Sequence, residues 1–284
     1  MAEPLIEVDG LTVRFPTADG GWSTVVDGVR FAAGYERLAI VGESGSGKSL
    51  TARAILGLVP APGQVTAERL HLAGRDLRNL TPSAWERVRG AEIGLVLQDP
   101  RFALNPLHRV GRQVEEALVL HTSLGRAERR ERALDMLDAV GLERPRDVYH
   151  LFPGQLSGGM GQRVMIAAML VARPKLLIAD EPTSALDENL RRQILQLIAD
   201  LAERHHMGLI LISHDLQQVA DFADEVIVMF RGRIVDRRGA RDLAHSSNPY
   251  TAMLWNCRPS AATYGTRLPT LAAAEREALD DRGA

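Results

Sequence analysis

The sequence predicts an α/β fold with a mostly parallel sheet, an N-terminal antiparallel β-subdomain and an inserted α-helical subdomain. Three short, almost continuous apolar runs, at residues 37–42, 175–180 and 208–213, are typical of strands that are buried on both faces. Residues 189–206, between the last two runs, have the spacing of an amphipathic helix. Strand, helix and strand in this order predict a right-handed parallel crossover.

Antiparallel strands are expected before and after the parallel part of the sheet. Residues 5–15 and 24–33 alternate apolar and polar side chains and are bounded by glycine turns, which favours an antiparallel arrangement. Residues 225–238 have the pattern of a hairpin that turns at Arg231 and Gly232.

A helical insertion is expected between the first and the second buried strand. Thr81 is suited to cap a helix and Pro82 to occupy its first position. Residues 110–121 and 126–142 have the spacing of amphipathic helices.

Composition excludes several classes of protein. The chain has 284 residues, a net charge of −2 and 45% hydrophobic residues, so it has ample material for a core and no sign of nucleic-acid binding. Its single cysteine, Cys257, excludes an internal disulfide framework and fits a reducing compartment. The N-terminus lacks the apolar core of a signal peptide. The longest apolar run, residues 164–172, is shorter than the roughly 18 residues of a membrane-spanning helix, so we expect the chain itself not to cross a bilayer.

One glycine-rich loop has the residues of a phosphate-binding loop. Gly42, Gly47, Lys48 and Ser49 fit G-x-x-x-x-G-K-[ST] between a buried strand and a helix, which predicts a phosphate-loop NTPase core. Backbone N–H groups would surround the β-phosphate, the lysine would lie between the β- and γ-phosphates, and the serine hydroxyl would reach Mg²⁺. A flexible Gly/Ser turn is the competing interpretation, but strand, motif and helix occur in register. The expected nucleotide contacts are Gly42, Ser44, Gly45, Ser46, Gly47, Lys48, Ser49 and Leu50.

Polar residues that follow the buried strands are candidates for catalysis. Asp180 would reach Mg²⁺, and Glu181 would orient or deprotonate an attacking water. Alone, this pair could equally be an acidic helix start before Pro182. His214 and Gln98 also follow strands, at the edge where ligands gather, and Gln98 could sense the metal or the water.

Residues 154–167 contain a second possible phosphate cradle. Ser157 can cap the following helix, and the glycines after it leave N–H groups exposed to an anion. A single fold would struggle to bring both cradles to one nucleotide. A head-to-tail pair of domains would let each second cradle close on the γ-phosphate of its neighbour.

This constellation resembles the ATP-binding-cassette (ABC) ATPases over roughly residues 4–256. The motifs occur in the family's order: the phosphate loop, the glutamine of the Q-loop, "LSGGM" at 156–160, "LLIADE" at 176–181, "SALD" at 184–187 and the switch histidine. The resemblance implies a helical subdomain over about 81–173 and a tail over 257–284, and the periodicity indeed fades from Ser246 onward, where we expect loose packing.

The resemblance also implies roles for single residues. Ser157 and Gly159, with Gly158 between them, would contact the γ-phosphate across a dimer, and Asp187 would couple the two sites. The other roles fall to Glu181 for water activation, His214 for gripping the γ-phosphate, Phe15 for stacking on adenine, and Ser49, Gln98 and Asp180 for Mg²⁺. Phe15 has an alternative interpretation as a core aromatic on a strand.

More narrowly, segments such as "LNPLHRVGRQVEEAL" and "NPYTAML" resemble the subfamily that energises dipeptide, oligopeptide and nickel importers. That implies a second ATPase subunit, two integral-membrane permease subunits, an extracytoplasmic substrate-binding protein and a peripheral place at the cytoplasmic face of the membrane. Two departures stand out. Gly161 replaces a residue that is commonly basic or polar, and Cys257 alone cannot build the iron–sulfur centre of many peptide-importing relatives, which favours nickel or metal chelates slightly.

Other classes are expected to look different. Soluble cassette ATPases of DNA repair carry long coiled coils or zinc modules, and this sequence has neither heptads nor cysteine pairs. Translation-factor cassettes occur as two in one chain. An unrelated phosphate-loop kinase or GTPase would leave "LSGGM" unexplained.

Overall fold

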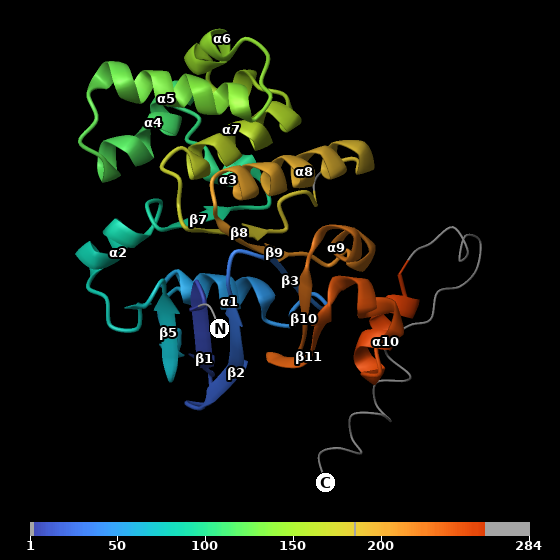
Figure 1. Ribbon diagram of the computed structural model, residues 1–284. Coiled ribbons are helices and arrows are strands. Elements are labelled where there is room, and N and C mark those ends of the chain that lie inside the picture. The colour runs from blue at the N-terminus through green and yellow to red at the C-terminus, as the bar shows by residue number, and fades with distance from the viewer. Residues whose placement is uncertain (1–2, 185, 259–284) are drawn as a thin grey trace. The chain divides into compact units, whose positions relative to one another are not determined.

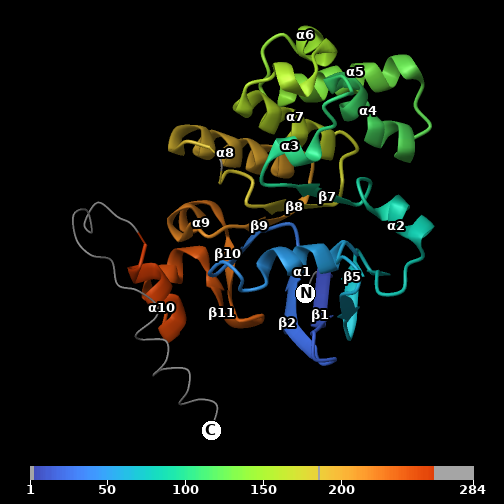
Figure 2. The ribbon, with the colours of Figure 1, turned by 180° about the vertical axis from the view of Figure 1, so that it is seen from behind.

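The computed structural model describes residues 3–184 and 186–258. The fold is α/β, and within those residues the strands form one sheet of five strands and one of six, so the predicted fold class is confirmed. The chain divides into two compact units (Figures 1 and 2). The first unit comprises residues 33–35 and 71–210 with the N-terminal residues up to Ile6, and the second comprises residues 7–32, 36–70 and those after 210.

The second unit holds the N-terminal strands and the start of the parallel sheet. β4 runs antiparallel to β1, β3 runs parallel to β10, and β10 and β11 form an antiparallel hairpin. Its elements are β1 (Ile6–Pro16), β2 (Trp22–Ala33), β3 (Arg37–Val41), α1 (Lys48–Ile55), β4 (Gln64–Thr66), α9 (Leu216–Phe222), β10 (Glu225–Phe230), β11 (Arg233–Gly239), the 3₁₀ helix η2 (Ala240–His245) and α10 (Pro249–Asn256).

The first unit holds the helical insertion and five further strands, of which β5 and β9 lie partly in the second unit. β9, β8 and β7 are neighbours in that order, and β7 and β8 are parallel. Helices α4, α5, α6 and α7 pack against one another as one group, as both ribbon views show. Its elements are β5 (Arg69–Leu72), β6 (Arg75–Asp76), α2 (Pro82–Val88), β7 (Ile93–Val96), α3 (Pro100–Ala103), α4 (Val110–His121), α5 (Arg126–Ala139), α6 (Pro145–His150), the 3₁₀ helix η1 (Pro153–Gln155), α7 (Gly158–Leu170), β8 (Leu176–Asp180), α8 (Glu188–Arg204) and β9 (Gly208–Ile212).

Several local predictions are confirmed for physical reasons that the sequence contains. The Thr81 side chain accepts a hydrogen bond from the N–H of Ala84 at 3.3 Å, so it caps α2 as expected. The β10–β11 hairpin turns at Arg231 and Gly232, which have φ of 45° and 83°. In a left-handed turn, glycine at the second position removes most of the steric cost.

The prediction of loose packing from Ser246 onward is wrong for the residues up to 258. α10 is anchored in the second unit, where Tyr250 and Thr251 are 3% and 0% exposed. The Asn248 side chain caps the helix, and the Thr251 hydroxyl donates to the Asp236 carboxylate at 2.7 Å. A cap and hydrogen bonds between polar side chains secure this short helix together with the buried Tyr250 and Leu254, and hydrophobic periodicity does not detect the polar contacts. From residue 259 on, the predicted tail lies outside the described residues.

No helix within residues 3–184 and 186–258 is long and apolar enough to cross a membrane.

Candidate nucleotide-binding site

The predicted phosphate loop connects β3 to α1 in the second unit. Its glycines have the positive φ angles that such a loop needs, with 148° at Gly42, 82° at Gly45 and 100° at Gly47. At Gly42 a Cβ would lie 2.2 Å from the Met229 carbonyl oxygen, so the loop closes onto β10 only with glycine at this position. Around Gly45 a Cβ would meet nothing within 4 Å, which leaves room for a ligand at the tip of the loop.

The loop encloses a buried ammonium group. Lys48 is 5% exposed, and its Nζ donates to the carbonyl oxygens of Gly42 at 2.8 Å and Glu43 at 2.7 Å. Gly47 caps α1 without a side-chain hydrogen bond, so no side chain of the cap covers the first-turn N–H groups. A positive charge beside an open helix N-terminus fits the phosphates of a nucleotide.

His214 lies in the same unit as this loop. The N–H of Ser213 donates to the carbonyl oxygen of Ile40 at 3.2 Å, two residues before the loop begins. The predicted switch histidine, His214, therefore comes directly after Ser213, which forms a hydrogen bond to β3, the strand that leads into the loop. The side chain of His214 is exposed. Asp215 caps α9 by accepting from the N–H of Gln218 at 3.0 Å.

Phe15 is half-buried and lies at the end of the apolar face of β1. Its ring covers Gly63, where a Cβ would lie 2.6 Å from the ring carbon Cε1. This contact gives Phe15 a packing role between β1 and the chain before β4. Its stacking on adenine stays a prediction.

In the first unit, parallel pairing brings three other predicted residues to one sheet edge. Val96 of β7 pairs with Ala179 of β8, so Gln98 and Glu181, each two residues further on, leave the sheet at the same edge. Asp180 and Glu181 are half-buried and Gln98 is exposed. This edge is where ligands bind in open α/β sheets.

Glu181 has a backbone conformation that is unusual for a residue with a side chain. Its φ is 49°, in the left-handed region. Its carbonyl oxygen accepts hydrogen bonds from the N–H and the hydroxyl of Ser184, both at 3.3 Å. The next carbonyl oxygen, that of Pro182, accepts from Nε2 of Gln162 at 2.5 Å.

Gln162 was not among the predicted site residues, although the sequence contained a signal. It is 1% exposed on α7, on the same face as Met165 and Ile166, three and four residues later, which are both 0% exposed. A polar side chain on an otherwise apolar helix face requires a hydrogen-bond partner.

Ser157 caps a helix as predicted, and Asp187, for which no cap was predicted, also caps a helix. Ser157 caps α7 and accepts from the N–H of Met160 at 3.3 Å, and both Ser157 and Gly158 are exposed. Asp187 caps α8 and accepts from the N–H of Leu190 at 3.0 Å. Both helix starts therefore face solvent in the first unit, and residue 185 of the "SALD" segment lies outside the described residues.

The predicted site residues are thus divided between the units. The second unit contains the phosphate loop, His214 and Phe15, and the first contains Gln98, Ser157, Gly158, Gly159, Asp180, Glu181 and Asp187.

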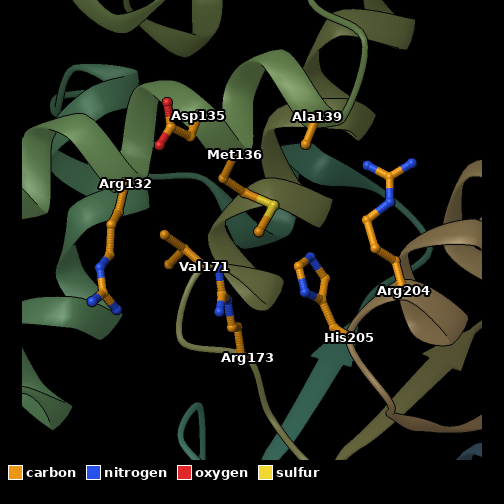
Figure 3. A pocket seen from close by; sticks show the side chains of 8 residues that line it. All are labelled: Arg132, Asp135, Met136, Ala139, Val171, Arg173, Arg204 and His205. Atoms are coloured by element: carbon orange, nitrogen blue, oxygen red, sulfur yellow. The ribbon is translucent and has the colours of Figure 1, made fainter.

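A pocket of about 130 Å³ in the first unit contains none of these residues (Figure 3). Its basic side chains include Arg173, after α7, and Arg204 and His205, at the end of α8. The Arg204 cation, in the last turn of α8, offsets the partial negative charge of that helix C-terminus. Burial, together with the charges of the two arginines, holds the pKa of His205 below its usual value. The remaining lining residues are Arg132, Asp135, Met136, Ala139 and Val171.

Comparison with known sequences gives a consistent set of relatives. The sequence model of the family described as "ABC transporter" matches residues 29–184. The chain is 42% identical to the dipeptide transport ATP-binding protein DppD of Escherichia coli K12, over 94% of this chain and 82% of that protein. It is also 42% identical to the oligopeptide transport ATP-binding protein OppD of Bacillus subtilis 168, over 92% of this chain and 74% of that protein.

Solved structures show the same fold. The ATP-binding cassette MJ0796, in a dimeric post-hydrolysis state with ADP and phosphate, matches with a TM-score of 0.72 and 30% identity, over 83% of this chain and 99% of that one. CbiO1 of Clostridium perfringens, part of the transporter complex CbiONQ, matches with a TM-score of 0.72 and 26% identity, over 87% of this chain and 93% of that one.

Proposed function

The chain belongs to the ABC transporter family, and from this premise we propose that it is the ATP-hydrolysing subunit of a membrane importer for peptides. It is an ABC-type ATPase and binds ATP. The observation that carries the proposal is the phosphate loop around Lys48, on a chain 42% identical to a dipeptide transport ATP-binding protein over 94% of its length.

Peptides are the cargo that the relatives favour. The single Cys257 pointed slightly to nickel or metal chelates. The two relatives described above, each 42% identical to this chain, carry the names of dipeptide and oligopeptide transport proteins. We therefore assign peptides as the cargo and keep nickel as the alternative outcome of the cargo experiment. These transport names also leave the soluble DNA-repair class without support.

Hydrolysis in this proposal depends on the residues that the ABC resemblance assigns to the metal, the water and the γ-phosphate. Mg²⁺, held by Ser49, Asp180 and Gln98, would neutralise charge on the β- and γ-phosphates. Both a hydroxyl and a carboxylate are oxygen ligands of the kind that Mg²⁺ takes. The Glu181 carboxylate orients the attacking water and accepts its proton, and His214 holds the γ-phosphate.

We further propose that two cassettes pair head-to-tail, with residues 4–256 as the cassette, a helical subdomain over about 81–173 and a tail over 257–284. Ser157 and Gly159 of one cassette then contact the γ-phosphate that the other binds. The exposure of Ser157 at the start of α7 supports this arrangement. The pair would act on two permease subunits supplied by an extracytoplasmic binding protein, at the cytoplasmic face of the membrane.

The first test measures, by light scattering, whether the Glu181→Gln variant dimerises in the presence of Mg-ATP. This variant keeps the groups that bind ATP and loses the base, so it is expected to accumulate a closed dimer. Adding Ser157→Arg is expected to abolish the dimer. A Glu181→Gln variant that hydrolyses ATP at the wild-type rate contradicts the role of this carboxylate.

The cargo is tested in the whole transporter. The chain is isolated with its membrane subunits through an affinity tag and reconstituted in vesicles with the matching binding protein. ATP-dependent uptake of a labelled dipeptide supports the proposal. Uptake of nickel but not of peptides overturns the assignment of cargo while leaving the ATPase in place.

A further inference from the structure

Hydrogen bonds from two other residues fix the backbone around Glu181 within the first unit. The Glu181 carbonyl accepts two hydrogen bonds from Ser184, and the Pro182 carbonyl accepts one from Gln162. Pro182 also has a restricted φ. A left-handed conformation at a residue with a side chain persists only where its surroundings determine it, and here Gln162 supplies the contact from another element.

The Gln162 contact cannot be replaced by solvent. Both Gln162, at 1% exposed, and Pro182 are buried, and the amide joins positions 20 residues apart in the sequence. A buried carbonyl that loses its donor cannot form a hydrogen bond to water instead. The loop must then either move or contain an unsatisfied hydrogen-bond acceptor.

The donor belongs to the helix that begins at Ser157. α7 starts directly after this residue, and Gln162 is five residues on, about 7.5 Å along a rigid helix. The first turn of α7 also lies against α8, the helix that follows the Glu181–Asp187 loop, because a Cβ at Gly159 would lie 3.1 Å from Cδ2 of Leu190. α7 therefore contacts the start of the loop that carries the proposed base and the helix that follows this loop.

We propose that Gln162 is a positioning residue for hydrolysis: its amide ties the signature helix to the backbone that aims Glu181. This inference rests on the proposed role of Glu181. When Ser157 contacts the nucleotide bound by a neighbouring chain, a displacement of α7 would also shift Glu181 of the same chain as Ser157, through one helix and one hydrogen bond.

The test is Gln162→Met, which keeps the length of the side chain and removes the donor. We expect kcat for ATP hydrolysis to fall about 10- to 100-fold with KM for ATP changed less than about twofold, since a misplacement of the order of 1 Å has such effects. The variant should still form the Mg-ATP-dependent dimer.

Gln113→Met is the matched control. Gln113 is a buried glutamine in α4 of the same unit, and its amide donates to the carbonyl oxygens of Asn105 at 3.0 Å and His108 at 2.8 Å. Its loss should lower thermal stability and leave kcat within about twofold of wild type. An equal fall of kcat in both variants would show a general structural effect and overturn the proposal.

Gln162→Glu adds a readout that packing alone does not give. A buried carboxyl can donate to the Pro182 carbonyl only when it is protonated, so kcat should rise as pH falls through the raised pKa of the new group. A pH profile identical to wild type, or a Gln162→Met variant with wild-type kcat beside an inactive Glu181→Gln, overturns the positioning role. Hydrolysis retained in Glu181→Gln instead refutes the role of Glu181 itself.

Discussion

Replacing Ser157 with aspartate separates two roles that this residue combines. Its hydroxyl caps α7 by accepting from the N–H of Met160 at 3.3 Å, and in the proposed dimer it also contacts a neighbour's γ-phosphate. Aspartate is as good a helix cap as serine. No acidic residue lies in the first turn of α7, so a carboxylate there also interacts favourably with the helix dipole.

The same carboxylate repels a phosphate. Two unit charges about 4 Å apart at an effective dielectric constant near 20 interact with about 4 kcal/mol. At 1.4 kcal/mol for each factor of ten, this weakens the ATP-dependent dimer by about 10³-fold. Ser157→Ala instead loses about 1 kcal/mol of stability from the helix cap and introduces no charge that repels the phosphate.

The assay combines thermal unfolding with light scattering in the Glu181→Gln background. Ser157→Asp should keep the wild-type melting temperature and fail to dimerise, while Ser157→Ala should melt a few degrees lower and dimerise more weakly than wild type. Thr81→Asp, which places a carboxylate at the equivalent cap of α2, is the control and should dimerise normally. Normal ATP-dependent dimerisation of Ser157→Asp would refute the contact between this serine and a phosphate.

Three further predictions follow from single contacts. Lys48→Ala should reduce ATP affinity about 10- to 150-fold in a fluorescent-nucleotide titration, because a charged hydrogen bond contributes about 1.5–3 kcal/mol and the lysine bridges phosphate and loop; unchanged affinity would contradict the site. Gly161→Ala should raise the melting temperature by about 2–4 °C, since alanine favours a helix by about 1 kcal/mol and its Cβ would lie at an ordinary 3.4 Å from Cγ of Pro100; a lower melting temperature would show a clash. Burial raises the pKa of Asp236, but hydrogen bonds from neighbouring side chains lower it by a larger amount. The pKa of this carboxyl group therefore lies below its usual value. Its folded pKa is therefore below the unfolded one, and its stabilisation is present above pH 4 and lost as pH falls through the folded pKa; Asp236→Asn should flatten this acid limb in denaturant unfolding.

Local patterns in the sequence were sufficient for the parallel strands, the phosphate loop and two helix caps. The phosphate loop needs only a buried strand, glycines at set positions and a helix that follows, and all of these are contiguous between residues 37 and 55. The caps at Thr81 and Ser157 are equally local, because each side chain bonds to an N–H three residues on. A contiguous pattern dictates a contiguous structure.

Contacts between distant residues were decided by the tertiary structure. The closure of Gly42 on the Met229 carbonyl, the burial of α10 by way of Asp236 and the bond from Gln162 to Pro182 each join positions far apart in the chain. The sequence reveals that a buried glutamine needs a partner, but not which carbonyl will be near it. That choice depends on how helices and strands pack, which is set by the whole core rather than by the residues on either side.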